Sequence, residues 1–179
     1  YGGGGAPGAP WRNDFIELFN RGTTAVSLNG WSVQYANPAA STWQVTALSG
    51  TLNPGQYYLV KEGGGAGVGA ALPLADAGNT SLMHNTLGKV ALVNGTTSLA
   101  GLCPAPGTYE DFVGYGAAVT CAEGSSPTAD LSNATAAVRS GGGCTDTNNN
   151  AADFTVTGAA SPGPRNGAFL PLNPCGSLS

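Results

Sequence analysis

The sequence is poor in charged residues, since Asp, Glu, Lys and Arg together make up 9% of its 179 residues. An average soluble domain has about 25%. The net charge is −4. Nucleic-acid binding draws on clustered Lys and Arg that release counterions from the phosphates. The basic residues are instead scattered: Arg12, Arg21, Lys61, Lys89, Arg139 and Arg165. The sequence therefore predicts no nucleic-acid partner.

Signatures of catalysis are also missing. The only histidine is His84, and no G-x-S-x-G segment accompanies it, so a Ser-His-Asp site is not predicted. The run Gly63–Gly69 resembles a dinucleotide fingerprint only superficially, because no helical pattern follows it before Pro73. Carboxylates of the type used in glycoside hydrolysis stand at ordinary strand positions: Glu17, Glu62, Glu110 and Asp111. We therefore expect a protein that is not an enzyme and holds no organic cofactor.

Long apolar runs and helical periodicity are absent as well. No run approaches the roughly 20 residues that a membrane-spanning helix needs, so no membrane span is predicted. No window repeats at 3.6 residues, so little helix is expected. The sequence starts at Tyr1 without a signal peptide, and we expect that such a leader was removed or lies outside this sequence.

What the sequence does contain is a series of short segments with the two-residue period of a β-strand. In Phe15–Phe19, Ile16 and Leu18 oppose their neighbours, and in Trp31–Tyr35 the odd-numbered residues oppose Ser32 and Gln34. Asn29-Gly30 and Asn94-Gly95 are hairpin signals. Further candidate strands lie at 42–46, 56–62, 89–93, 109–115, 136–139 and 153–157. Many short strands between Gly, Pro and Asn turns predict an all-β sandwich.

One segment carries a family resemblance. It reads FIELFNRG…VSLNGWSVQYA, with YGGGG ahead of it and VGYG and NNAADF behind. In these motifs the chain resembles the bacterial secreted branch of the lamin tail domain (LTD) family. The resemblance implies an all-β, immunoglobulin-like β-sandwich of the lamin-tail type. It names no ligand, because members of the family differ in role.

The resemblance covers most of the chain, from Tyr1 to about Asn166. We therefore assign residues 1–166 to one lamin-tail-like domain and residues 167–179 to a C-terminal tail. Three Gly/Ala/Pro/Ser-rich stretches within the domain are expected to be long, irregular loops: 2–10, 63–79 and 121–133.

The four cysteines are even in number and lack the C-x-x-C spacing of zinc or redox sites. Their order allows three pairings. We favour Cys103–Cys121 and Cys144–Cys175, because each first partner lies in a loop-like segment and each closure is short. Each bridge is worth about 3 kcal/mol in the chain-entropy model, and the second would tie back the tail. The alternative is four reduced, buried thiols. Disulfides and the low charge favour a secreted or cell-surface location.

One cluster suggests a metal. Asp146, Asn148, Asn150 and Asp153 place side-chain oxygens at nearly alternate positions, as calcium loops do, because calcium takes several oxygen ligands. The match is partial, since Ala151 stands where glycine is usual and no glutamate follows at the twelfth position. The alternative is an Asx-rich turn whose side chains bond to the local backbone. Calcium is the only metal that the sequence suggests.

Three function classes remain. The leading hypothesis is a non-catalytic extracellular immunoglobulin-like module with a structural or surface-binding role, whose partner is an extracellular or cell-surface protein or polysaccharide. The second is a self-assembling subunit of an extracellular filament or surface layer. The third is an accessory binding domain of a larger secreted hydrolase or nuclease.

The start of the chain favours self-association by strand addition. In the family that the chain resembles, an apolar strand runs directly into YGGGG, whereas Tyr1 is the first residue here. A sandwich without its first strand has an edge of unpaired backbone groups to which another strand can add. The candidate donors are Gly2–Gly5 or Gly167–Leu172 of another copy, the latter limited by Pro171. Such head-to-tail donation does not close on itself and would build a fibre.

The disulfide pairing gives the first testable prediction. Digestion of the unreduced protein, followed by mass spectrometry, should yield one peptide pair linked through Cys103 and Cys121 and another through Cys144 and Cys175. A matched digest of the reduced protein should contain neither pair. Recovery of a peptide pair linked through Cys121 and Cys144 would contradict the assignment.

Overall fold

The computed structural model describes residues 1–65, 67–172 and 175. Within these residues the regular structure is almost entirely β, which confirms the predicted class. The strands are β1 (Phe15–Phe19), β2 (Val26–Ser27), β3 (Ser32–Ala36), β4 (Gln44–Ala47), β5 (Thr51–Leu52), β6 (Tyr57–Lys61), β7 (Ala77–Gly78), β8 (Gly88–Val93), β9 (Asp111–Tyr115), β10 (Thr135–Arg139) and β11 (Phe154–Gly158). The helices are a 3₁₀ turn, η1 (Gly141–Gly143), and α1 (Asn150–Asp153).

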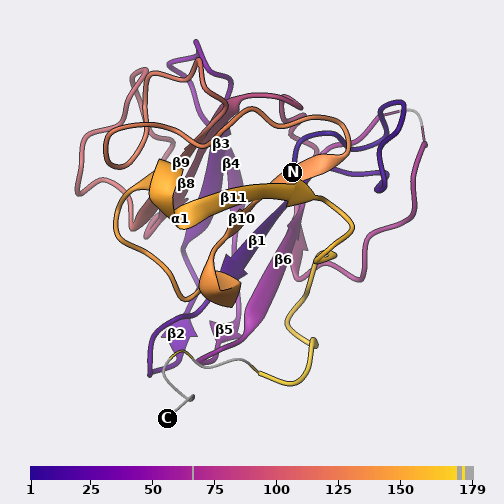
Figure 1. Ribbon diagram of the computed structural model, residues 1–179. Coiled ribbons are helices and arrows are strands. Elements are labelled where there is room, and N and C mark those ends of the chain that lie inside the picture. Colours follow the sequence, from indigo (N-terminus) through magenta and orange to yellow (C-terminus); the bar gives the residue numbers. More distant parts are fainter. Residues whose placement is uncertain (66, 173–174, 176–179) are drawn as a thin grey trace.

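Two sheets face each other and form the predicted sandwich (Figure 1). One has the strand order β1-β6-β7 and the other β4-β3-β8-β9. Val33 from β3 and Val60 from β6 are 1% and 0% exposed and meet in the core between the sheets. Ile16 and Leu18 of β1 pack against the same core, as their alternation predicts.

Neither of the two hairpin signals forms a two-residue loop between paired strands. Asn29-Gly30 leads into β3, which pairs with β4 and β8, whereas β2 pairs with β5. Asn94-Gly95 follows β8 and begins the long connection to β9, the next strand, which pairs with β8 antiparallel. The hairpin interpretation is therefore wrong at Asn29-Gly30, whereas at Asn94-Gly95 the flanking strands do pair, through a long loop instead of a tight turn. A turn sequence fixes only the local backbone, while all five residues of β3 are buried and require a neighbour on each side.

The outer face of the four-stranded sheet is covered by loops rather than by solvent. Gln34 is 0% exposed, and its amide donates to the backbone oxygen of Thr97 at 2.9 Å. Lys89 is also 0% exposed, donates to two loop carbonyls and lies 5.3 Å from the centre of the Trp43 ring. Burial lowers the pKa of this lysine. The outer loops therefore enclose side chains that the strand pattern alone would leave in water.

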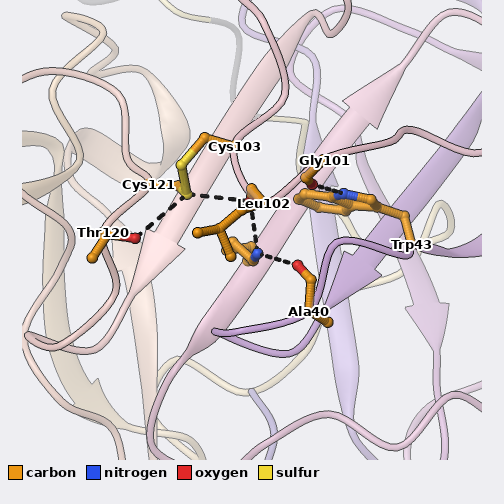
Figure 2. Close-up of a disulfide and its surroundings, with 8 residues drawn as sticks. Ala40, Trp43, Gly101, Leu102, Cys103, Thr120 and Cys121 are labelled. Atoms are coloured by element: carbon orange, nitrogen blue, oxygen red, sulfur yellow. Dashed lines mark hydrogen bonds between the residues drawn. A yellow bond between two sulfur atoms is a disulfide. The ribbon is translucent and has the colours of Figure 1, made fainter.

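Two disulfides hold loop segments, and they are the two pairs that the sequence favours. Cys103–Cys121 ties the outer loops beside Trp43 (Figure 2), with Cα atoms 5.4 Å apart. Cys144–Cys175 ties the tail to the segment after β10, with Cα atoms 5.6 Å apart. Residues 173–174 and 176–179 of the predicted tail, and residue 66 of the predicted loop, lie outside the described residues.

The hairpin of β10 and β11 covers part of the outer face of the three-stranded sheet. β10 and β11 pair with each other and run across the molecule in front of β1 (Figure 1). Ala136 of β10 and Ala159, directly after β11, pack with Tyr1 and Phe15. The stretch 2–10, predicted as an irregular loop, is partly packed inside the fold. A Cβ atom on Gly4 would overlap the backbone of Asn13, so the glycine allows a close backbone approach.

A helical turn, α1, stands where the sequence predicts other structure. The sequence predicts a strand from residue 153, whereas Asn150–Asp153 form a single helical turn and β11 begins at Phe154. Asn149 caps this turn by accepting a hydrogen bond from the backbone of Ala152. Among the described helices, none has the length and apolar character needed to traverse a bilayer.

Candidate functional site

An apolar groove of about 410 Å³ is lined by residues of both sheets. It lies where β1, an edge of one sheet, and β9, an edge of the other, border the open side of the sandwich. β10 borders it as well. We call this feature the edge groove. Its apolar lining comes from both sheets and from the hairpin: Ile16, Leu18, Val90, Leu92, Val113 and Ala137.

In β8, the residues that face the core between the sheets are more exposed than the residues that face outwards. Val90 and Leu92 face the core between the sheets, yet both are only half-buried. Lys89 and Ala91 face outwards and are 0% exposed. Val113 of β9 is also half-buried. In a closed sandwich the inward positions are the better covered ones, so the core is incompletely filled beside β1 and β9.

The backbone of β1 presents hydrogen-bonding groups to the edge groove. Ile16 stands opposite Val60 of β6, whereas the amide of Phe15 points to the other edge and donates to the oxygen of Tyr1 at 3.0 Å. Tyr1 nitrogen donates back to the oxygen of Phe15 at 3.1 Å. Because successive residues of a strand alternate in direction, the groups of Glu17 and Phe19 also point to this edge. No backbone hydrogen bond joins them to a described residue on this side.

An ion pair lies beside the groove. The carboxylate of Glu17 accepts hydrogen bonds from the Arg165 guanidinium and backbone nitrogen, both at 2.6 Å. The guanidinium stacks 3.7 Å from the centre of the Tyr57 ring. Burial raises the pKa of Glu17, while the bonds and charge of Arg165 oppose that rise. Glu17 therefore anchors the segment that contains Arg165, and its role is structural.

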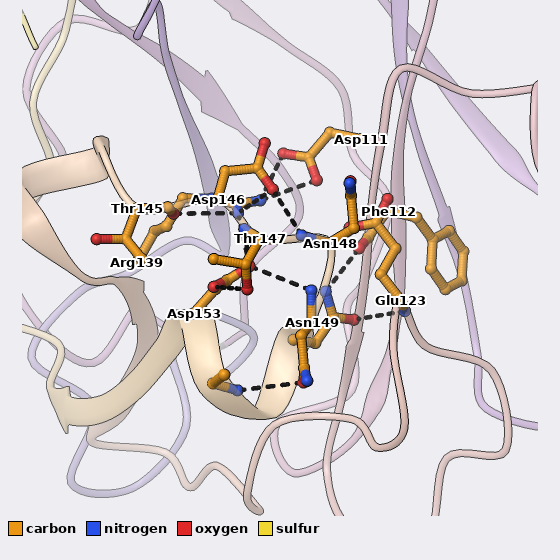
Figure 3. Close-up of polar contacts among 12 residues, drawn as sticks. Asp111, Phe112, Glu123, Arg139, Thr145, Asp146, Thr147, Asn148, Asn149 and Asp153 are labelled. Carbon is orange, nitrogen blue, oxygen red and sulfur yellow. Dashed lines mark hydrogen bonds and ion pairs between the residues drawn. The ribbon is translucent and has the colours of Figure 1, made fainter.

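A second polar cluster surrounds Arg139, at the end of β10 (Figure 3). Its guanidinium holds both oxygens of Asp111 at 2.8 and 2.6 Å and lies 3.2 Å from Asp146. Asp153 lies 3.7 Å from the same guanidinium. Burial raises the pKa of Asp111 in spite of this charge. The cluster joins β9, β10 and the Asx-rich turn.

Asp153 organises that turn. Its carboxylate accepts from the backbone and hydroxyl of Thr147, at 2.8 and 2.7 Å, and from the backbone of Asn149 at 3.2 Å. Burial alone would raise the pKa of Asp153, but these bonds and the charge of Arg139 lower it. The aspartate thus does the backbone capping that an Asx-rich turn requires.

The structure brings together two of the four residues predicted to bind calcium. Asp146 and Asp153 meet at Arg139. The side-chain oxygen of Asn150 instead accepts from Gly114 and Glu123 amides, at 2.8 and 3.2 Å. Asn148 is exposed. A guanidinium occupies the position between the carboxylates, so the contacts favour the turn interpretation. The calcium hypothesis itself is untested, and the titration described below decides between it and the turn.

Other residues considered for chemistry have structural contacts. The Nδ1 atom of His84 accepts hydrogen bonds from the backbone of Thr86 and Leu87, at 3.1 and 3.3 Å. Glu62 is 1% exposed and accepts from the hydroxyl of Thr46 at 2.6 Å. Within the described part of the chain, no three His, Cys, Asp or Glu side chains are grouped as metal ligands.

Sequence reasoning did not find the edge groove. Its alternating strands predict that Ile16, Val90 and Val113 are core residues, and they do face the core. These residues are half-exposed because they lie near β1 and β9, which are sheet edges. No local sequence pattern indicates which strands become edges. Glu123 was also missed, because one acidic residue in a Ser/Pro-rich loop has no distinguishing signal.

Comparison with known proteins gives one match. The family model described as Lamin Tail Domain matches residues 1–117. That range includes β1 to β9 and ends before β10 and the second disulfide. No curated protein and no solved structure matches the chain.

Calcium titration separates the two interpretations of the Asx-rich turn. From the contacts above we expect no heat in calorimetry and an unchanged melting temperature at millimolar calcium, with chelator-treated protein as the reference. Binding heat with a raised melting temperature, both lost in Asp146→Asn, would instead establish the calcium site.

Glu123 gives a pH-dependent prediction. Burial, followed by the charges of Asp111 and Asp146, raises its pKa to about 7, and its Oε2 atom is buried without a hydrogen-bond partner among the described residues. A raised folded-state pKa means that stability is lost as pH rises from the unfolded value towards 7. The substitution Glu123→Gln should therefore leave the free energy of unfolding unchanged at pH 4 and increase it at pH 8.

The expected increase in the free energy of unfolding at pH 8 is about 1 kcal/mol. This is less than the full pKa shift implies, because the side chain is half-exposed and solvent screens its charge. Urea denaturation at the two pH values measures it. Glu110→Gln, at an exposed site directly before Asp111, is the matched control and should change little. Equal effects of Glu123→Gln at pH 4 and pH 8 would contradict the assignment.

Proposed function

The chain belongs to the lamin tail domain family, and we propose that it acts outside the cell as a non-catalytic immunoglobulin-like module with a structural or surface-binding role. Membership gives a fold used for binding and structure. The extracellular location and the kind of partner are the parts proposed.

The edge groove carries the proposal. It combines half-buried apolar side chains, such as Leu92 and Val113, with backbone groups of β1 that have no partner among the described residues. The charged groups beside it are paired with each other, Glu17 with Arg165 and Asp111 with Arg139. A site of this kind offers contact area and backbone hydrogen bonds rather than a nucleophile or a general base.

Two features support an extracellular location. Both disulfides close within the fold, and the described residues contain no free cysteine. Disulfides persist in oxidising compartments and are rare where thiols are kept reduced. The low content of charged residues, 9%, adds to this, since it is typical of exported proteins with neutral polar surfaces.

The groove favours a polypeptide partner over a polysaccharide, because its lining is apolar and its hydrogen-bonding groups are those of a strand edge. The same edge supports a second candidate function, a self-assembling subunit of an extracellular filament or surface layer. In that case the partner is another copy of the chain.

Surface accessibility on the source cells tests the location. Antibody raised against the purified chain should label intact cells without permeabilisation, and protein recovered by mild shaving should contain no free thiol. A cytosolic protein of the same cells, detected only after permeabilisation, is the control. Labelling that requires permeabilisation, together with four reactive thiols, would overturn the proposal.

A further inference from the structure

Asparagine is followed by glycine at three places in the sequence: Asn29-Gly30, Asn94-Gly95 and Asn166-Gly167. In such a pair the backbone nitrogen of the glycine can attack the side-chain carbonyl carbon of the asparagine, because glycine has no Cβ atom to obstruct the approach. The reaction needs an asparagine side chain that is free to turn and a glycine nitrogen that is not engaged in a hydrogen bond. The fold decides which of the three pairs meets both conditions.

The pair Asn166-Gly167 is held at both reacting groups. The side-chain nitrogen of Asn166 donates to the backbone oxygen of Leu74 at 2.8 Å, and its side-chain oxygen accepts from the nitrogen of Ala168 at 3.1 Å. The nitrogen of Gly167, which would be the nucleophile, donates to the Asp76 carboxylate at 2.8 Å. These hydrogen bonds would have to break before the two groups could react.

The pair Asn29-Gly30 is held in a turn. The side-chain oxygen of Asn29 accepts from the backbone nitrogen of Gly50 at 2.9 Å. The nitrogen of Trp31 donates to the oxygen of Leu28 at 3.0 Å and closes the turn, in which Gly30 has a φ of 81°. A positive φ at this position is that of a type II turn, which sets the backbone of both central residues. The asparagine therefore cannot swing onto the glycine nitrogen without breaking the turn.

The pair Asn94-Gly95 meets both conditions. Asn94 is exposed, directly after β8. Neither its side chain nor the nitrogen of Gly95 forms a hydrogen bond with any residue that the structure describes. A Cβ atom placed on Gly95 would meet only the Cγ1 atom of Val93 within 4 Å, at 3.9 Å, so the space beside the reacting atoms is open. This pair is thus the least restrained of the three.

The backbone that follows Asn94 covers part of the outer face of the four-stranded sheet. The oxygen of Gly95 accepts from the buried hydroxyl of Ser32 at 2.6 Å. The amide of Gln34 donates to the same hydroxyl at 3.1 Å and accepts from the backbone nitrogen of Leu99 at 2.8 Å. The loop therefore keeps these bonds only while its backbone leaves β8 at its present length and direction.

We propose that Asn94 is a site of spontaneous modification, at which the asparagine converts to isoaspartate and thereby loosens the loop over Gln34. The nitrogen of Gly95 loses its proton and bonds to the side-chain carbonyl carbon of Asn94, while the bond from that carbon to the side-chain nitrogen breaks and ammonia leaves. Water then opens the cyclic imide at either carbonyl and gives isoaspartate or aspartate. In isoaspartate the main chain runs through the former side chain, so the backbone ahead of Gly95 is longer by one methylene group. This inference is independent of the proposed binding function.

Ageing of the purified full chain at pH 8 tests the site. Peptide mapping, with fragmentation that distinguishes isoaspartate from aspartate, should show conversion at Asn94 at least tenfold faster than at Asn29 or Asn166. The rate should rise with pH, because the attacking nitrogen has to lose its proton. The reduced chain, unfolded in guanidinium chloride, is the matched control. In that chain the three sites should convert at similar rates, since only the fold separates them.

Two variants check the assignment of the modified peptide. Asn94→Gln should abolish conversion at this site, because the longer side chain closes a ring far more slowly, and should leave the circular dichroism spectrum unchanged. Asn29→Gln, at another exposed Asn-Gly pair, should leave the rate at Asn94 unaltered.

The isoaspartate form, separated by ion exchange through its added negative charge, tests the effect on the loop. Hydrogen exchange at the amide of Leu99 should be at least tenfold faster than in fresh protein, because its bond to Gln34 opens more often. Exchange at Leu59, whose amide donates to Asp76 beside the other sheet, should not change and serves as the internal control.

Two outcomes would overturn the proposal. Conversion at Asn94 that is no faster than at Asn29 and Asn166 in the folded chain would remove the site, and this comparison needs no variant to fold. Unaltered exchange at Leu99 in the isoaspartate form would show that the loop over Gln34 accommodates the longer backbone. Both outcomes are independent of surface labelling, so either would leave the extracellular assignment intact.

Discussion

Burial of β3 and β8 on both faces is the constraint on which the rest of the structure depends. On the inner face, Val33 needs the sheet that contains β1 and β6. On the outer face, Gln34 and Lys89 are fully buried and need a layer of loops that supplies backbone acceptors. A buried lysine without these carbonyls would be costly. The long loops after β8 and the Cys103–Cys121 bridge are therefore part of the core's cover rather than appendages (Figure 2).

The inner face of the β4-β3-β8-β9 sheet is less fully buried than its outer face. The sheet containing β1 ends at that strand, and the sheet containing β8 ends at β9, so both edges border the same side of the molecule. The hairpin of β10 and β11 crosses this side without pairing to either edge (Figure 1). Apolar residues that close-packed cores would cover remain half-buried there. These half-buried side chains line the edge groove.

Charge is concentrated where separate segments have to be held together. Glu17 with Arg165 fastens the approach to the tail, and Arg139 joins Asp111 of β9 to the Asx-rich turn (Figure 3). In a chain with few charged residues, these partly buried pairs fix register between elements that share few apolar contacts. Removing one partner from such a pair leaves the other desolvated. The same pairing leaves little charge available for chemistry beside the groove.

The sequence by itself determined the all-β class, the positions of most strands, the faces to which Ile16, Leu18, Val33 and Tyr35 point, and the cysteine pairs that the structure forms, because these depend on local alternation and short chain separation. It misassigned the turn at Asn29-Gly30 as a hairpin, did not reveal that a long loop joins the paired strands β8 and β9, and gave no sign of α1. Only the tertiary structure decided which strands are neighbours, that Lys89 is enclosed and that β1 and β9 border the same groove. Those features arise from pairing between distant segments, such as β1 with β6, and strand periodicity specifies a residue's face but not its partner.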